Sequence, residues 1–134
     1  MKKQGRNSSY MFLLWGLILV NLLSCNKSET EAVEENPIPV LITQAVTGIT
    51  ATSATSGGVI TSDDGNDILA RGVCWHTSQN PTTSNNKTSD GTGTGSYFSS
   101  VTGLTPGTTY YLRAYATNQF GTGYGNSFSF TTTP

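Results

Sequence analysis

The sequence holds few of the residues on which metal centres and nucleophilic sites depend. Only two cysteines and one histidine occur among its 134 residues. His76 stands beside Trp75, with no second histidine and no cysteine at metal-ligand spacing. No specific Ser/His/Asp set can be assembled around it either. The sequence therefore predicts no catalytic residue, no metal site and no cofactor.

Positive charge is scarce as well. Counted from Cys25 to Pro134, four bases face eight acids, which gives a formal charge of −4. Proteins that bind nucleic acid need basic patches to neutralise phosphates. This composition argues against a nucleic-acid partner.

No apolar run is long enough to span a membrane as a helix, which takes about 20 apolar residues. The longest run, residues 11–20, follows three bases near the N-terminus, is continued by Leu22 and Leu23, and stops before Ser24 and Cys25. A basic start, a short apolar core and a small residue at the cut site are typical of a secretory signal peptide. The alternative is a buried helix, but no later segment offers it a helical partner. We predict a signal peptide over residues 1–24.

The residues at the predicted cut site, Leu22-Leu23-Ser24-Cys25, resemble the lipobox of bacterial lipoproteins. The resemblance implies that Cys25 becomes the new N-terminus and carries a diacylglycerol. Each buried methylene contributes about 0.8 kcal/mol to membrane affinity, so several acyl chains would anchor the protein. An ordinary secretion signal with a chance cysteine is the alternative.

The segment after Cys25 is polar, acidic and closed by Pro37 and Pro39. Such a composition buries too little apolar area to fold, so we predict a flexible tether over residues 25–39. Its acidic cluster resembles the surface-export signals of lipoproteins from Bacteroidetes, although a solvated spacer explains it equally well. The expected location is the outer membrane, with the lipid-anchored protein facing the cell surface or the periplasm.

From Val40 onward no stretch shows the apolar period of a helix. Short runs of β-branched and aromatic residues alternate with Gly, Asn, Asp and Pro clusters, which predicts an all-β sandwich over residues 40–134. The expected strands cover residues 40–50, 54–61, 67–77, 96–101, 109–118 and 124–132, with a turn at 62–66. The polar stretch 79–95 holds at most one short edge strand.

The clearest predicted strand is residues 109–118. Its alternate residues are apolar or small, which marks one buried face. That face comprises Tyr110, Leu112, Ala114 and Ala116. The opposite face carries Tyr111, Arg113 and Tyr115.

The stretch Leu104-Thr-Pro106-Gly-Thr-Thr-Tyr110 resembles the E-to-F region of fibronectin type III domains. In that family a Leu, a Pro and a Tyr form the tyrosine corner, so the resemblance implies that the Tyr110 hydroxyl turns back to the corner backbone. It also places Val73 and Trp75 on the inward face of strand C. The family's strand-B Trp is missing from residues 54–61, and we expect Trp75 to fill that volume.

A further resemblance lies between residues 70 and 95. The Ala-Arg-Gly-Val-Cys-Trp, Asn-Pro-Thr and Asp-Gly-Thr-Gly-Thr-Gly segments are similar to those of domains in Bacteroidetes surface lipoproteins. In such proteins the module often precedes another domain. Cys74, which lies in the first segment, is interpreted as a packed small residue because no basic neighbour or second cysteine activates it.

Tyr111, Arg113 and Tyr115, together with Phe120 in the predicted F–G loop, are the candidate binding surface. Two rings flanking a guanidinium can stack on a sugar ring or on an aromatic side chain. The alternative, which we favour for the strand residues, is that neighbouring strands cover this face with ordinary cross-strand pairs.

Two Gly-containing segments imitate ligand-binding motifs without matching them. The acidic turn at residues 63–67 lacks the glycine spacing of an EF-hand loop. The alternating glycines of residues 91–95 precede no helix, so a phosphate loop is not indicated. Both segments are interpreted as turns or loops.

The functional expectation is a membrane-anchored, non-enzymatic lipoprotein whose fibronectin type III-like sandwich is an adhesion module that binds a glycan or a protein. The first alternative is a structural spacer, or a stand-alone fragment of a multidomain lipoprotein, with no ligand of its own. The second is an enzyme subunit or weak hydrolase, whose turnover would disappear with His76→Ala.

Overall fold

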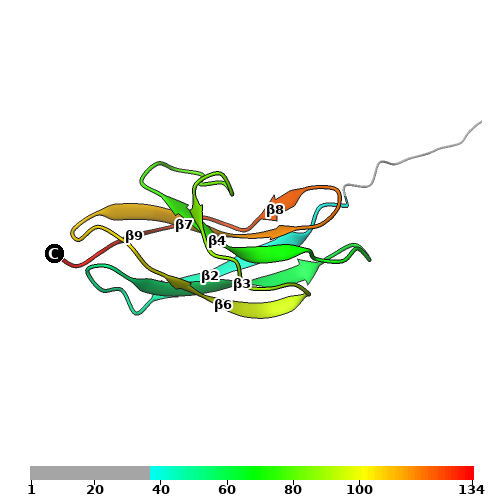
Figure 1. Cartoon of the computed structure of the whole chain (residues 1–134), viewed down its shortest axis with the longest axis horizontal. Coiled ribbons are helices and arrows are strands. Elements are labelled where there is room, and N and C mark those ends of the chain that lie inside the picture. Colours follow the sequence, from blue (N-terminus) through cyan, green and yellow to red (C-terminus); the bar gives the residue numbers. More distant parts are fainter. Residues whose placement is uncertain (1–36) are drawn as a thin grey trace, which may run out of the picture. The chain divides into compact units, whose positions relative to one another are not determined.

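The computed structural model describes residues 37–134, which form two antiparallel β-sheets without a helix (Figure 1). The predicted all-β class is confirmed. The signal peptide, Cys25 and most of the predicted tether lie outside the described residues. Among residues 37–134 no helix is long and apolar enough to cross a membrane.

The two sheets stack as the layers of a sandwich (Figure 1). The first sheet has the strand order β2-β3-β6, and the second has the order β5-β4-β7-β8, with β9 also pairing with β7. The first sheet comprises β2 (Val40–Thr47), β3 (Ala54–Ser62) and β6 (Gly95–Val101). The second comprises β4 (Ala70–His76), β5 (Asn86–Lys87), β7 (Thr109–Thr117), β8 (Thr122–Tyr124) and β9 (Phe128–Thr131).

The core lies between the sheets and follows the predicted period of two. On β7, Leu112, Ala114 and Ala116 are fully buried and Tyr110 is 7% exposed. Their neighbours on β4, including Val73, face the same core because β4 and β7 pair in register. The inward faces predicted for these two strands are confirmed. The core cluster is Leu41, Ala54, Ile60, Ile68, Val73, Trp75, Tyr97, Val101, Leu104, Tyr110, Leu112, Ala114, Ala116 and Phe130.

The strand predicted for residues 124–132 is interrupted. Between β8 and β9, the Gly125 amide donates to the Ala114 carbonyl oxygen (2.9 Å). The freed Ala114 amide donates instead to Oγ1 of Thr43 on β2 (2.9 Å), and the Thr43 amide donates to Asn126 Oδ1 (3.0 Å). The interruption therefore ties the first sheet to the second through hydrogen bonds.

Tyr97 on β6 is buried in the core between the two sheets. A methyl group added at Gly58 on β3 would overlap the Tyr97 hydroxyl, so only glycine leaves room for this ring. The hydroxyl crosses the core and donates to the Gly72 carbonyl oxygen (2.8 Å). Trp75 is also buried, at 7% exposure. The burial of Tyr97 in the core was not predicted from the sequence.

Residues 37–39, assigned above to the tether, contact the sandwich. Pro39 is buried, and its carbonyl oxygen lies so close to Gly123 on β8 that a side chain there would collide with it. The Asn118 side-chain amide donates to the Pro37 carbonyl oxygen (2.6 Å). The compact unit consequently begins at Pro37 rather than at Val40.

Candidate functional site

The E–F corner is built around Tyr110. Its hydroxyl accepts a hydrogen bond from the Thr105 amide (2.9 Å), and its ring stacks on Phe130 with centroids 5.8 Å apart. Leu104 lies beneath the corner at 4% exposure, while Pro106 stays at the exposed turn. All of the partners of Tyr110 are internal, so this corner supports the fold.

Tyr115 does not belong to an exposed surface. Its side chain is 2% exposed, and its hydroxyl donates to the Thr88 carbonyl oxygen. The place of Tyr115 in the candidate binding surface is therefore wrong, and the favoured alternative of a covered face holds for this residue. The physical reason is the segment after β4, because residues around Pro81 and Thr88 fold over the outer face of the second sheet.

Arg113 is held by the same segment. Its Nε donates to the Pro81 carbonyl oxygen (2.7 Å), and its guanidinium carbon lies 4.1 Å from the ring centroid of Tyr124. The Tyr124 hydroxyl in turn accepts a hydrogen bond from the Thr83 amide (3.1 Å). This guanidinium thus serves an internal cation–π contact.

Cys74 lies under the same cover and is fully buried. Its Sγ lies 3.5 Å from the Pro81 carbonyl oxygen and 3.6 Å from that of Arg113. Burial raises the pKa of the Cys74 thiol to about 11, against the opposing charge of Arg113. The thiol is protonated at neutral pH and is the packed small residue that the sequence predicts.

The two motif-like segments are held by hydrogen bonds between side chains and their backbone. In the acidic turn, Asp63 Oδ1 accepts a hydrogen bond from the Gly65 amide (2.9 Å). In the glycine-rich loop, the Arg71 guanidinium donates to the carbonyl oxygens of Asp90, Gly93 and Thr94. Over residues 37–134 no group of three His, Cys, Asp or Glu residues could hold a metal ion.

The F–G loop presents an apolar side chain on a fixed base. Asn118 is 3% exposed, and its Oδ1 accepts hydrogen bonds from the amides of Phe120 (2.8 Å) and Gly121 (3.1 Å). The Asn118 backbone amide donates to the Gly121 carbonyl oxygen (3.0 Å). The Phe120 side chain is 57% exposed. The loop is therefore pre-organised around a solvent-facing ring.

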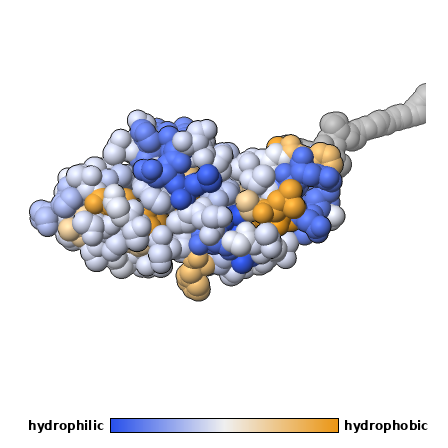
Figure 2. All heavy atoms as spheres, in the orientation of Figure 1, coloured by the Kyte–Doolittle hydropathy of each residue, from blue (hydrophilic) through white to orange (hydrophobic). Residues whose placement is uncertain are grey.

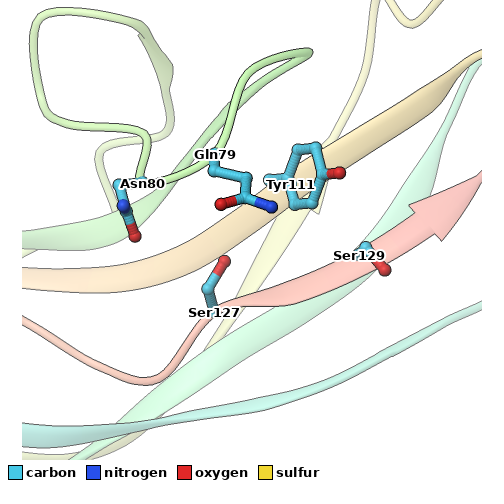
Figure 3. Close-up of a pocket in the computed structure, with 5 residues that line it drawn as sticks. All are labelled: Gln79, Asn80, Tyr111, Ser127 and Ser129. Atoms are coloured by element: carbon cyan, nitrogen blue, oxygen red, sulfur yellow. The ribbon is translucent and has the colours of Figure 1, made fainter.

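A small polar hollow opens beside Tyr111 (Figure 3). Its volume is about 210 Å³, and no charged side chain lines it. Figure 3 shows the Gln79 amide next to the Tyr111 ring, with the Ser127 hydroxyl pointing toward Gln79. We call this site the Tyr111 hollow. Its lining residues are Gln79, Asn80, Tyr111, Ser127 and Ser129.

The four residues of the predicted binding surface do not form one site. Tyr115 is buried, and the Arg113 side chain is hydrogen-bonded to the Pro81 carbonyl oxygen, whereas Tyr111 borders the hollow. Phe120 follows the far end of β7, and the six residue steps from Tyr111 to Thr117 alone span about 20 Å. Sequence reasoning missed the serines and amides of the hollow, because they meet Tyr111 only through the pairing of β7 with β9 and the fold of the loop after β4.

No protein-family model and no curated protein matches the chain. Solved structures do. The sensor domain of the anti-sigma factor RsgI4 in Pseudobacteroides cellulosolvens aligns with 75% of this chain and 98% of its own length, at 19% identity and a TM-score of 0.52. The FN1–FN3 domains of chicken CNTN1 align with 79% of this chain and 35% of theirs, at 11% identity and a TM-score of 0.53.

A computationally redesigned β-sandwich protein aligns with 74% of this chain and 97% of its own length, at 26% identity and a TM-score of 0.50. The strand orders β2-β3-β6 and β5-β4-β7-β8 correspond to the A-B-E and C′-C-F-G sheets of fibronectin type III domains. Residues 37–134 form a single fibronectin type III-like β-sandwich.

Proposed function

We propose that the protein is a non-enzymatic, lipid-anchored lipoprotein that displays its sandwich as an adhesion module for a protein ligand. The N-terminal pattern that ends at Cys25 supports the anchor, and the resemblance of the acidic segment after it to Bacteroidetes export signals supports an outer-membrane location. The sandwich supplies a rigid scaffold on which loops carry the binding residues.

The observation that carries the binding role is the geometry of the F–G loop. Phe120 exposes more than half of its side chain, yet the backbone beneath it is fixed by Asn118. An aromatic side chain on a backbone that is already fixed loses less conformational entropy when a partner covers it than one on a flexible loop. Aromatic anchors of this kind fill pockets at the centre of protein interfaces.

The binding role is tested with the mature chain on a protein array and a glycan array. We expect a protein hit whose affinity falls at least about tenfold in Phe120→Ala, because truncating an interface anchor costs more than about 1.4 kcal/mol. Phe98→Ala is the matched control, since Phe98 is 75% exposed on β6, in the other sheet. A complete lack of hits would favour a spacer, and a hit that ignores Phe120 would move the site elsewhere.

The anchor is tested separately by the intact mass of the chain produced in a host that processes lipoproteins. We expect a mass that matches residues 25–134 plus acyl groups. Cys25→Ser is the control and should give a product without acyl groups that no longer partitions with the membrane. A product that still begins at Met1 in the soluble fraction would overturn the proposed anchor.

A further inference from the structure

The Tyr111 hollow is lined entirely by uncharged side chains that can form hydrogen bonds. It combines one aromatic ring, two side-chain amides and two hydroxyls. Tyr111 is half-buried, while Gln79, Asn80, Ser127 and Ser129 are exposed, so their polar atoms are open to solvent. A side-chain amide carries both a donor and an acceptor, and a serine hydroxyl does the same on one atom. The hollow can therefore exchange hydrogen bonds in both directions with a ligand that has several hydroxyl groups.

The walls of the hollow are fixed by their surroundings. On one side Ser129 pairs with Tyr111 across β9 and β7. On the other side Gln79 and Asn80 precede Pro81, which is buried and whose carbonyl oxygen accepts the hydrogen bond from Arg113. A site whose backbone is already in place avoids the entropic cost of ordering its loops on binding.

The volume and charge of the hollow restrict what it holds. Its volume of about 210 Å³ is below the range of about 300–1,000 Å³ that is usual for pockets that enclose a drug-sized ligand. One six-membered ring fits this scale better than an extended chain. Because no cation lines the hollow, it offers no opposite charge to offset the desolvation of a phosphate or carboxylate.

We propose that the Tyr111 hollow binds one neutral pyranose ring of a saccharide, with the apolar face of the sugar against the Tyr111 ring and its hydroxyls on the amides and serines. The site differs from the F–G loop and goes beyond the protein-binding role proposed above. It lies near the start of β7, whereas the chain enters the sandwich beside Asn118 at the other end of this strand. Both sites can consequently be occupied at once.

The test is a titration followed by heteronuclear NMR on the chain from residue 25 with Cys25→Ser, which removes the acylation site. The probes are methyl β-glucopyranoside, methyl β-galactopyranoside, N-acetylglucosamine, glucuronate and a proline-rich peptide. We expect at least one neutral sugar to shift the side-chain amide signals of Gln79 and Asn80 with a dissociation constant of roughly 1 mM, and glucuronate to bind more weakly.

Variants locate the site. Tyr111→Ala should weaken sugar binding about tenfold through the lost ring contact, whereas Tyr111→Phe should keep most of it. Phe98→Ala is the matched aromatic control and should leave the titration unchanged. The proposal is overturned if no neutral sugar shifts these signals, if only the proline-rich peptide does so, or if folded Tyr111→Ala binds as well as the parent. Neither failure nor success bears on the effect of Phe120→Ala, so the two proposals are judged independently.

Discussion

The two sheets of the sandwich treat their outer faces differently. On the second sheet, the segment after β4 contacts the outer face through Pro81 and Thr88, so that Tyr115 and Cys74 are buried although neither faces the central core. On the first sheet, Ile42 and Phe98 remain 53% and 75% exposed. Figure 2 shows an apolar side chain projecting from the side of the molecule on which β6 lies in Figure 1. Strand alternation identifies the outer face, but a separate segment decides whether that face meets water.

The largest expected contrast is between two aromatic truncations. Tyr115→Ala removes a buried ring and should lower the free energy of unfolding by about 3–5 kcal/mol, as large-to-small changes in packed regions do. Phe98→Ala acts on the uncovered face and should change it by less than about 0.5 kcal/mol. Denaturant unfolding followed by far-ultraviolet circular dichroism measures both. Equal effects would show that the cover over Tyr115 adds no packing energy.

A milder variant separates the ring of Tyr115 from its hydroxyl. Tyr115→Phe keeps the packing and loses only the hydrogen bond to the Thr88 carbonyl oxygen. The expected loss is about 1 kcal/mol, the usual net value of one such bond. A loss as large as that of Tyr115→Ala would instead assign the stabilisation to the hydroxyl, and the same unfolding measurement decides between them.

Alkaline pH should loosen the covered face through Cys74. Its pKa rises from 9.0 in a model thiol to about 11 in the folded protein, because burial disfavours the thiolate. The folded state retains a proton that the unfolded state releases, so the free energy of unfolding should fall as the pH rises from about 9 to about 11. Burial also raises the pKa of Tyr97, which acts in the same direction.

This pH effect is measured as the midpoint of denaturant unfolding at a series of alkaline pH values. Cys74→Ala should make the decline shallower, while leaving the part that comes from Tyr97. If the variant and the parent decline in parallel, the thiol does not titrate as its burial implies.

The last expected effect concerns Arg113, whose side chain binds the segment that covers Tyr115. Arg113→Met keeps an apolar stem but loses the hydrogen bond to the Pro81 carbonyl oxygen and the cation–π contact with Tyr124. The expected destabilisation is about 1 kcal/mol. Alkylation of Cys74 in the native protein should accelerate about fivefold, since it reports local opening of the cover. Ile42→Thr, on the uncovered face, should leave the alkylation rate as it is.

The buried side of β7 was predictable because alternation along one strand is a local pattern. The same holds for the segment from Leu104 to Tyr110, whose resemblance implies the corner that the structure contains. The segment that covers Tyr115 was not predictable, because it is polar. That segment binds the face through the carbonyl oxygens of Pro81 and Thr88, and backbone carbonyls leave no mark in a sequence.

The candidate site was even harder to predict from the sequence. Tyr111 could be chosen from the strand pattern, but its neighbours come from two distant parts of the chain. Ser129 reaches it through strand register, and Gln79 reaches it through the path of a loop. Similarly, the sequence around Tyr97 does not indicate that its hydroxyl reaches Gly72 across the core. That contact depends on how closely the sheets approach at Gly58.

The side-chain amide of Asn118 joins two segments at one end of the sandwich. The nitrogen of Asn118 holds Pro37, and its oxygen holds the turn that carries Phe120. Mechanical tension on the chain before Pro37 would therefore load the same side chain that shapes the F–G turn. A pulling force at Pro37 and the conformation of the turn that presents Phe120 would therefore be coupled through Asn118.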